Sequence, residues 1–361
     1  MNSKKKILLF NHSLDSGGSE NVLSNIANFL VKKNYEVIML TLSGEEYDDF
    51  YELDNKVRRE KLGIVGSRNK IYLRFFNLIK KIFYLRKSII KNNPDKIISF
   101  IDTNNLLMLI SCFGLKKSII ISERVYPGKH RIPKKWHLLR KILYKYSFLL
   151  VVQTNHTKRW FEKNLSSFRI EVIPNSVNLQ NFSLEKKKSI IAVGRLEHQK
   201  GFDILIKAFS KIHSEFNEWN LKIYGKGSKM KELNKLASTL KIKNKINFYE
   251  PTKEIHEKIA SSSLFVHPAR YEGFPNVILE AMSVGTAVLA SDCPAGPSEI
   301  IKHKNSGILF PVDNINILAD YLRILLSDKQ LRQKFEKNAK IHVNNYSHNQ
   351  IMKRWEDLVN Q

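Results

Sequence analysis

Two glutamates with a short spacing flank a loop that has the composition of an anion-binding turn. Glu272 and Glu280 lie eight positions apart. Between them a loop joins an apolar run to a helical pattern, and it consists of Gly273, Phe274, Pro275 and Asn276. A helix start offers unpaired N–H groups and the positive end of the helix dipole, which favour phosphate. Without a metal pair, flanking carboxylates suit hydroxyl groups. The pattern predicts a ligand with phosphate and sugar or ribose hydroxyls; ordinary helix surface charges are the alternative.

Two further loops of the second half follow apolar runs and combine glycine with cations. In the first, the charges of Arg195 and Lys200 can converge on one diphosphate. They would stabilise a departing nucleoside diphosphate without a divalent ion, so no metal site is expected. The second is a G-x-G turn with Gly225 and Gly227, which lets the backbone approach a base or ribose closely. A solvated basic loop and a simple tight turn are the alternatives.

These loops need a framework of strand ends, and an alternating apolar pattern supplies one in each half of the chain. Runs typical of buried strands occur at residues 6–10, 35–40, 96–100, 118–122, 148–153 and 169–173, and again at 190–193, 221–224, 245–248, 264–267 and 287–290. Helical patterns follow many of them, at residues 20–33, 202–216, 230–240, 276–284 and 315–326. The alternation predicts an α/β fold with two doubly wound, Rossmann-like domains, whose ligand lies outside the carboxyl ends of parallel strands.

Length and composition agree with two soluble domains. The chain has 361 residues, which exceeds one ordinary core, and no apolar stretch approaches the ~20 residues of a membrane span. Its two cysteines favour a reducing compartment. Lys and Arg total 60 against 34 Asp and Glu, a formal charge of +26. Nucleic acid, an anionic membrane and phosphorylated substrates are the partners that such a charge allows, beside a merely solvated basic surface.

Two segments of the first half resemble ligand-binding strand ends. Gly17, Gly18, Ser19 and Glu20 follow the first apolar run and open a helix. The glycines allow a close turn, and Ser19 or Gly18 can cap the helix; a plain capping turn is the alternative. Arg124 ends the run at 118–122 and is a candidate charge contact for a ligand.

Residues 70–91 form an amphipathic pattern with a basic side. At about 100° per residue, Ile71, Phe75, Leu78, Ile82, Leu85 and Ile89 share one side, and Lys70, Arg74, Lys80, Lys81, Lys87 and Lys91 lie opposite, with Arg86 intruding on the apolar side. Such a helix either lies in an anionic membrane interface or packs on the core and presents cations to diphosphates. An ordinary core-packing helix is the alternative.

Taken together, these motifs resemble the retaining GT-B glycosyltransferases of family 4. Glu272 and Glu280 around Gly-Phe-Pro look like the family's E-x7-E signature, and Val-Gly-Arg-Leu, Gln-Lys-Gly and Tyr-Gly-Lys-Gly occur in the family's order. The stretch 292–300 is similar to one in N-acetylhexosamine transferases. Two departures are Tyr249-Glu250-Pro251, where relatives commonly have glycine, and the lack of a histidine near Arg124.

The resemblance implies a nucleotide-sugar site in a C-terminal domain, residues 179–345. Arg195 and Lys200 would bind the diphosphate, Glu280 the ribose and Glu272 the transferred sugar, with support from the loop after it. The first domain, residues 1–178 plus a closing helix at 346–361, would bind the acceptor across a cleft through the Gly17–Glu20 loop and Arg124. No general base is nominated, because the departing phosphate can take the acceptor proton in such enzymes.

The expected function is therefore transfer of a hexose or N-acetylhexosamine from a UDP-linked sugar, with UDP-N-acetylgalactosamine favoured. The acceptor is expected to be a glycan or a polyprenyl-diphosphate-linked glycan, at the inner face of the plasma membrane of a cytoplasmic, peripheral enzyme. Arg74, Lys80, Lys81 and Lys87 are the predicted membrane or lipid-diphosphate contacts. No other cofactor and no specific nucleic acid is expected. The alternatives are a basic nucleic-acid-binding protein and a sugar-nucleotide epimerase of the same fold.

Overall fold

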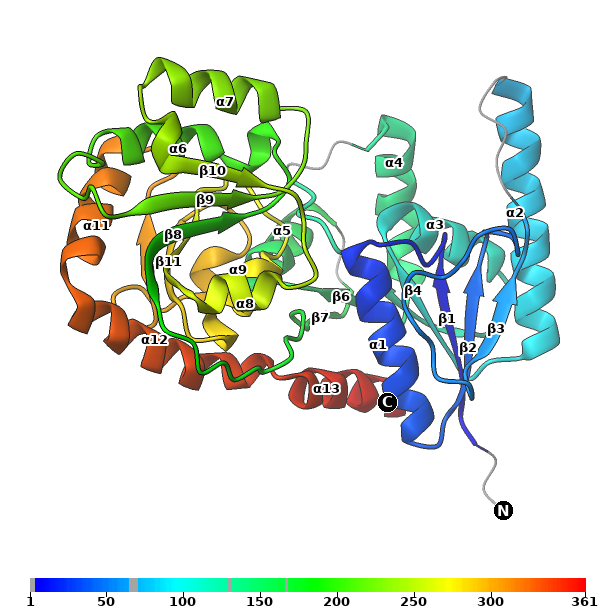
Figure 1. Cartoon of the computed structure of the whole chain (residues 1–361). Coiled ribbons are helices and arrows are strands. Elements are labelled where there is room, and N and C mark those ends of the chain that lie inside the picture. Colours follow the sequence, from blue (N-terminus) through cyan, green and yellow to red (C-terminus); the bar gives the residue numbers. More distant parts are fainter. Residues whose placement is uncertain (1–3, 65–70, 129–131, 166–167) are drawn as a thin grey trace. The chain divides into compact units, whose positions relative to one another are not determined.

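A computed structural model describes residues 4–64, 71–128, 132–165 and 168–361, apart from the side chains of residues 71–74 and 134. The chain forms two compact units, residues 1–174 with 351–361, and residues 175–350. Each unit has one sheet whose neighbouring strands all pair in parallel, and helices cover both faces (Figure 1). The two doubly wound α/β units predicted from the alternating pattern are confirmed.

The first unit contains a seven-stranded sheet in the order β3-β2-β1-β4-β5-β6-β7. Its strands are β1 (Lys6–Asn11), β2 (Glu36–Thr41), β3 (Arg58–Lys61), β4 (Lys96–Phe100), β5 (Ser118–Ser122), β6 (Leu149–Val152) and β7 (Ile170–Val172). Its helices are α1 (Gly18–Lys32), α2 (Ile71–Asn92), α3 (Asp102–Ser111), α4 (Lys134–Leu143), α5 (Asn155–Asn164) and α13 (His348–Asn360). The central strands are buried on both faces, as a parallel sheet between helices requires.

Helices α1 and α13 cover one face of this sheet, and α2 to α5 cover the other. Trp355 of α13 is buried and packs on Phe100 at the end of β4, with ring centroids 5.6 Å apart. The last helix therefore contributes to the core of the first unit, although the residues directly before it belong to the second.

Helix α2 places its residues differently from the amphipathic pattern in one respect. Leu85 and Ile89 are buried, and Leu78 and Ile82 pack beside them, as predicted. Phe75 does not join them, because the first turns extend past the core and leave its ring 63% exposed. Arg86, which the pattern placed on the apolar side, donates to the carbonyl oxygens of Ser111 and Phe113, at the end of α3. That contact satisfies carbonyls that a helix end leaves without partners.

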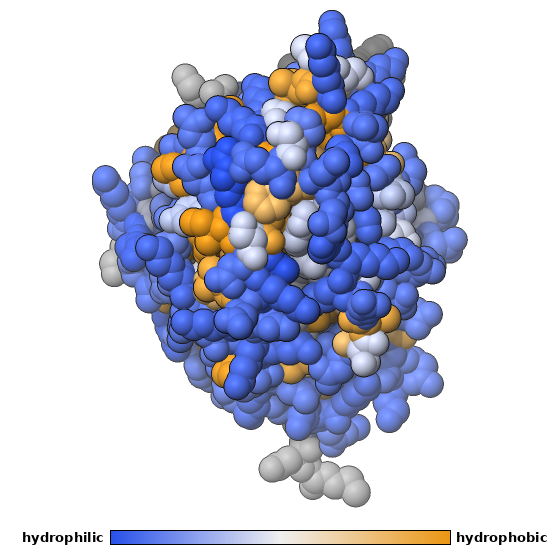
Figure 2. Space-filling view, turned by 60° about the vertical axis from the view of Figure 1, so that its left-hand side comes forward, coloured by the Kyte–Doolittle hydropathy of each residue, from blue (hydrophilic) through white to orange (hydrophobic). Residues whose placement is uncertain are grey.

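The second unit contains a six-stranded sheet in the order β10-β9-β8-β11-β12-β13. Its strands are β8 (Lys187–Val193), β9 (Asn220–Tyr224), β10 (Ile246–Tyr249), β11 (Ser262–His267), β12 (Ala287–Ser291) and β13 (Ile308–Phe310). Its helices are α6 (Phe202–Ser210), α7 (Met230–Thr239), α8 (Ile255–Ala260), α9 (Asn276–Ser283), α10 (Pro297–Ile300), α11 (Ile315–Ser327) and α12 (Lys329–Val343), with a short 3-10 turn at His198–Lys200. Figure 2 shows a largely hydrophilic surface with small hydrophobic patches.

Candidate active site

A lysine and a glutamate from two loops of the second unit meet at the carboxyl ends of neighbouring strands. Lys200 ends the 3-10 turn after β8, and Glu272 lies in the loop after β11. Lys200 Nζ is 2.5 Å from Glu272 Oε1, and His267 Nε2 lies 2.9 Å from the same oxygen. One carboxylate oxygen thus contacts a cation and an imidazole, four residues before α9 begins.

The surroundings keep this carboxylate charged. Glu272 is only 6% exposed, and burial alone would raise the pKa of its carboxyl group. The hydrogen bond with His267 and the charge of Lys200 outweigh burial and lower the pKa of Glu272 to about 2. Burial lowers the pKa of His267, so its neutral ring donates Nε2–H to Glu272 near neutral pH. The carboxylate is therefore an acceptor for hydroxyl groups and a poor base.

Side chains tie the two loops together around the Lys200–Glu272 pair. Gln199 Nε2 donates to the carbonyl of Tyr271 at 2.9 Å, and the guanidinium of Arg195 lies 3.4 Å from Gln199 Oε1. Arg270 forms a two-pronged pair with Asp203, at 2.9 and 2.8 Å. Predicted residues Arg195, Lys200 and Glu272 thus belong to one connected group, and the exposed Arg195 is joined to it through Gln199.

Glycines set the spacing of these loops. Gly201 has a left-handed backbone with φ of 66°, and a Cβ built there would be 2.0 Å from the carbonyl oxygen of Pro268. Gly194 gives room to the stem of Lys200. The predicted ligand glycines Gly225 and Gly227 approach the carbonyl oxygens of Gly194 and Leu196, where a Cβ would lie 1.9 and 2.4 Å away. The G-x-G turn therefore has a packing role of its own.

The other predicted donor residues lie at the start of α9. Gly273, Phe274 and Pro275 precede the helix, whose first residue is Asn276 and which has no side-chain cap. Glu280 lies one turn further, where burial raises the pKa of its carboxyl group. Within the part of the chain that the structure describes, the backbone carbonyl of Glu280 accepts from Ser283 and Val284, but no hydrogen bond or ion pair to its carboxylate occurs, so the carboxylate oxygens are available to hydroxyl groups.

In the first unit, the predicted acceptor loop is arranged differently from the expected cap. Gly17 is the N-cap of α1, and no side chain caps the helix. Ser19 does not cap but donates to Glu20 at 2.6 Å, because the Glu20 carboxylate folds back over Gly17. Gly18 is the first helical residue, so the capping role considered for it is also wrong.

Arg124 lies beside a buried charge cluster at the ends of β4 and β5. Its guanidinium stacks over Phe100, 4.8 Å from the ring centroid. The neighbouring Glu123 accepts from Tyr144 and pairs with Arg140 at 3.3 Å, and Arg140 also pairs with Asp102 at 3.2 Å. This cluster was not predicted from the sequence.

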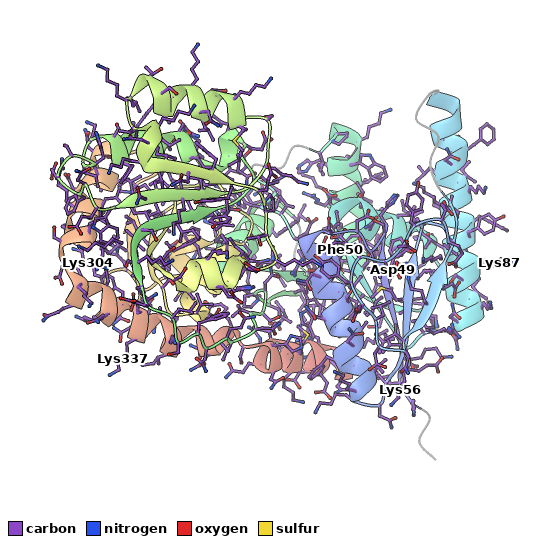
Figure 3. All side chains as sticks on the ribbon, viewed as in Figure 1. Asp49, Phe50, Lys56, Lys87, Lys304 and Lys337 are labelled. Carbon is purple, nitrogen blue, oxygen red and sulfur yellow. The ribbon has the colours of Figure 1, made fainter. Side chains whose placement is uncertain are left out.

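The predicted lipid-contact residues of α2 point in more than one direction. Lys80 and Lys87 are exposed, and Figure 3 labels Lys87 on α2. Lys81 is partly buried, which lowers its pKa. Burial, together with the charge of Lys81, lowers the pKa of the His12 imidazole after β1. The side chain of Arg74 lies outside those described, as does residue 70.

Sequence reasoning did not find His267, Gln199 or Arg270. His267 ends an apolar run and was interpreted only as part of the strand, although a polar ring at a strand end can reach an active-site loop. Among the described residues, no group of three or more His, Cys, Asp and Glu side chains could bind a metal ion. No helix among them is long and apolar enough to span a bilayer.

Comparison with known families identifies both halves. The family described as glycosyltransferase family 4 matches residues 16–181, and the family described as glycosyl transferases group 1 matches residues 178–342. The two matches together cover nearly the whole chain.

Individual relatives extend over the full length. A Campylobacter jejuni protein named GalNAc-α-(1→4)-GalNAc-α-(1→3)-diNAcBac-PP-undecaprenol α-1,4-N-acetyl-D-galactosaminyltransferase is 29% identical and covers 98% of each chain. The amylovoran biosynthesis glycosyltransferase AmsD of Erwinia amylovora is 28% identical and covers 99% of each. Anabaena HepE in complex with UDP has a TM-score of 0.81 at 18% identity, over 98% of this chain and 99% of that one, which shows a shared GT-B fold. The chain therefore belongs to the glycosyltransferases, with a family 4 first half and a group 1 second half.

Proposed function

We propose that this glycosyltransferase moves a hexose or N-acetylhexosamine from a UDP-linked sugar to a lipid-diphosphate-linked glycan, with retention of configuration and without a metal ion. The observation that carries the proposal is the contact between Lys200 and Glu272 beside the uncapped start of α9. Lys200 and Arg195 would stabilise the departing diphosphate. Glu272 would bind hydroxyl groups of the transferred sugar, and Glu280 those of the ribose.

The protonation state of Glu272 decides whether this residue could act as the base of an inverting reaction. A carboxylate with a pKa of about 2 takes up a proton poorly near neutral pH, so Glu272 does not suit the role of an inverting general base. The departing phosphate would instead accept the proton of the acceptor hydroxyl on the same face of the sugar. The anomeric configuration of the product, measured from NMR coupling constants, tests this step. A product of inverted configuration would overturn it.

The choice of donor and acceptor rests on the relatives. HepE is described in complex with UDP, and the Campylobacter jejuni relative is named for transfer of N-acetyl-D-galactosamine to a PP-undecaprenol-linked glycan. Both cysteines of this chain are unpaired and buried, as is usual in a reducing compartment. We accordingly propose UDP-N-acetylgalactosamine as donor and the cytoplasmic membrane face as the place of reaction.

Titration with UDP, GDP and their sugar conjugates, followed by a transfer assay on a lipid-diphosphate glycan, tests the donor site. We expect UDP to raise the melting temperature and GDP to have little effect. Lys200→Ala and Glu272→Ala should each lower transfer at least about 100-fold, because each removes charge stabilisation at the reacting centre. Lys188→Ala is the matched control, since Lys188 pairs with Glu218 on the exposed surface of the same unit. Unchanged turnover in either site variant, with the protein folded, would overturn the assignment.

The outer side of α2 supports a membrane surface. Phe75, Phe76 and Phe83 are 63%, 65% and 61% exposed, and the exposed Lys80 and Lys87 lie on the same helix. Large exposed aromatic rings interleaved with lysines suit an anionic lipid interface, where rings enter the headgroup boundary and cations meet lipid phosphates. The exposed phenylalanines strengthen this interpretation beyond the predicted basic stripe.

Vesicle sedimentation tests this surface. The full chain should bind vesicles that contain an anionic lipid more tightly than neutral vesicles, and salt should weaken the binding. Lys80→Glu with Lys87→Glu should lower it at least about 30-fold, because two lysines at roughly 1 kcal/mol each near the surface contribute about 2 kcal/mol. The control is Lys304→Glu with Lys337→Glu, two exposed lysines of the second unit, labelled with Lys87 in Figure 3. Equal binding by both double variants would reduce α2 to a scaffold helix.

A further inference from the structure

The chain passes between its two units twice, and both passages contact the loop at the start of α9. The first passage is at Pro174–Asn175 and the second at Gln350–Ile351. Asn175 is 5% exposed, and its Nδ2 donates to Asn276 Oδ1 at 2.6 Å. Asn276 is the first residue of α9. The first passage is therefore anchored on the predicted donor loop by a partly buried hydrogen bond.

The second passage contacts the same loop two residues earlier. The ring of Tyr346 lies against the ring of Phe274, with centroids 6.5 Å apart, and its hydroxyl donates to the carbonyl of Glu299 at 2.8 Å. Glu299 belongs to the segment that starts at Gly296, where a Cβ would be 2.4 Å from Pro275. Tyr346 thus packs on the loop from one side and fixes the segment beneath it.

The two passages are also joined to each other. The N–H of Val177 donates to the carbonyl of Tyr346 at 2.9 Å, and Val177 forms an isolated parallel bridge with Ser347. Val177 is buried, and Tyr346 and Phe274 pack against the same core cluster. Residues 174–177 and 344–347 are therefore joined to each other, and each segment contacts one residue of the loop, Asn276 or Phe274.

We propose that Asn175 and Tyr346 are positioning residues for the donor loop, so that both connecting segments set the geometry of the backbone that receives the sugar phosphate. This rests on the proposed function, because it takes the loop Gly273–Asn276 as the donor site. Neither residue needs to touch the donor: Asn175 acts through Asn276, and Tyr346 acts through Phe274. In return, a donor that orders the loop would also order the two passages.

Hydrogen exchange of the full chain without ligand tests the positioning itself. Asn175→Ala and Tyr346→Leu should each speed amide exchange in residues 273–278 about fivefold, the effect of one lost hydrogen bond or contact. Asn181→Ala, at an exposed residue four positions after Val177, is the matched control. Tyr346→Phe keeps the ring and should restore most of the protection that Tyr346→Leu removes. Unchanged exchange in both Asn175→Ala and Tyr346→Leu would overturn the proposal.

Donor kinetics separate this inference from the proposed function. Asn175→Ala should raise the KM for UDP-N-acetylgalactosamine about fivefold while the KM for the acceptor and the melting temperature change little. A purely structural residue would lower the melting temperature without a selective effect on the donor KM, and that result would overturn the proposal. If UDP gives no protection in residues 273–278 of the unaltered chain, the donor-site assignment fails instead, whereas the exchange comparison of the variants still decides the positioning role.

Discussion

The two units place buried carboxylates at the same kind of position, the carboxyl end of a parallel strand, yet give them opposite properties. Burial raises the pKa of Glu272, but the hydrogen bond with His267 and the charge of Lys200 outweigh it and lower the pKa to about 2. Burial raises the pKa of Glu123 to about 7 despite the charge of Arg140, and Asp102 adds to the rise. The difference lies in the ratio of partners. Glu272 has a lysine of its own, whereas Glu123 shares one arginine with a second carboxylate.

Glu272 therefore suits ligand binding, whereas the cluster of Asp102, Arg140 and Glu123 suits holding elements of the fold together. A permanently charged carboxylate beside a partly accessible lysine can bind and release polar ligands. A cluster in which one buried cation serves two carboxylates mainly joins α3, α4 and β5, because any change leaves a buried charge without compensation. Arg124 next to this cluster is therefore presented by a rigid strand end.

The largest expected effect is on the stability that the cluster of Asp102, Arg140 and Glu123 provides. Arg140→Met should lower the free energy of unfolding by about 3–5 kcal/mol, since it leaves Asp102 and Glu123 buried without a cation. Urea unfolding measures this. Arg169→Met, which breaks the exposed pair with Glu171 and removes the guanidinium from the Phe148 ring, should cost less than about 1 kcal/mol and is the control. A cost below 1 kcal/mol for Arg140→Met would show that the buried cluster does not stabilise the first unit.

A second, smaller effect concerns pH. The pKa of Glu272 is below its ordinary value of 4.5, so the stability from its charge is present above pH 4.5 and is lost as the pH falls towards about 2. The pKa of Glu123 is above 4.5, so its contribution is complete below pH 4.5 and is lost as the pH rises through about 7. Each change amounts to at most about 3 kcal/mol.

Urea unfolding of Glu272→Gln and Glu123→Gln against the unaltered chain checks both signs between about pH 3 and 8. The free energy of unfolding of the unaltered chain should increase relative to that of Glu272→Gln as the pH rises from about 3. The free energy of unfolding of the unaltered chain should decrease relative to that of Glu123→Gln as the pH approaches neutrality. Parallel curves for the two variants would show that both carboxylates sit in equivalent surroundings.

The smallest expected effect concerns helix caps, which should be equal in the two units. Thr154 accepts from the N–H of Thr157 at the start of α5, and Asp328 accepts from the N–H of Leu331 at the start of α12. Thr154→Ala and Asp328→Ala should each cost about 1 kcal/mol in thermal unfolding. Neither contacts the candidate site residues, so kcat should stay unchanged; a drop in kcat for either would show that scaffold and site are coupled.

The framework of both units could be predicted from the sequence because buried parallel strands are near-continuous apolar runs. The strands β4 and β5 were predicted to the residue. Strand β3 was not predicted because Arg58–Lys61 is entirely charged. It lies at the edge of the sheet, where a strand can remain partly exposed to solvent. Helix α12 was not predicted because its low apolar content gives no clear apolar stripe. Strand β13 was not predicted because three residues are too few for a periodic signal.

The site could be predicted only in part, for a different reason. Glu272, Lys200 and Arg195 carry charge in glycine-containing loops, so residue type and place suggested a role. The contacts of His267, Asn175 and Tyr346 depend on which loops meet in space. Nothing local in the sequence distinguishes His267 from any other residue that ends a buried strand.

Gly201 packs directly against the carbonyl oxygen of Pro268. The separation between the lysine-bearing and glutamate-bearing turns is fixed by main chain touching main chain, with no side chain in between. A relative that keeps both charged residues but carries even a methyl group at position 201 must spread these turns apart. Retention of the lysine and the glutamate alone is thus an insufficient criterion for an intact candidate site, and the glycine has to be counted with them.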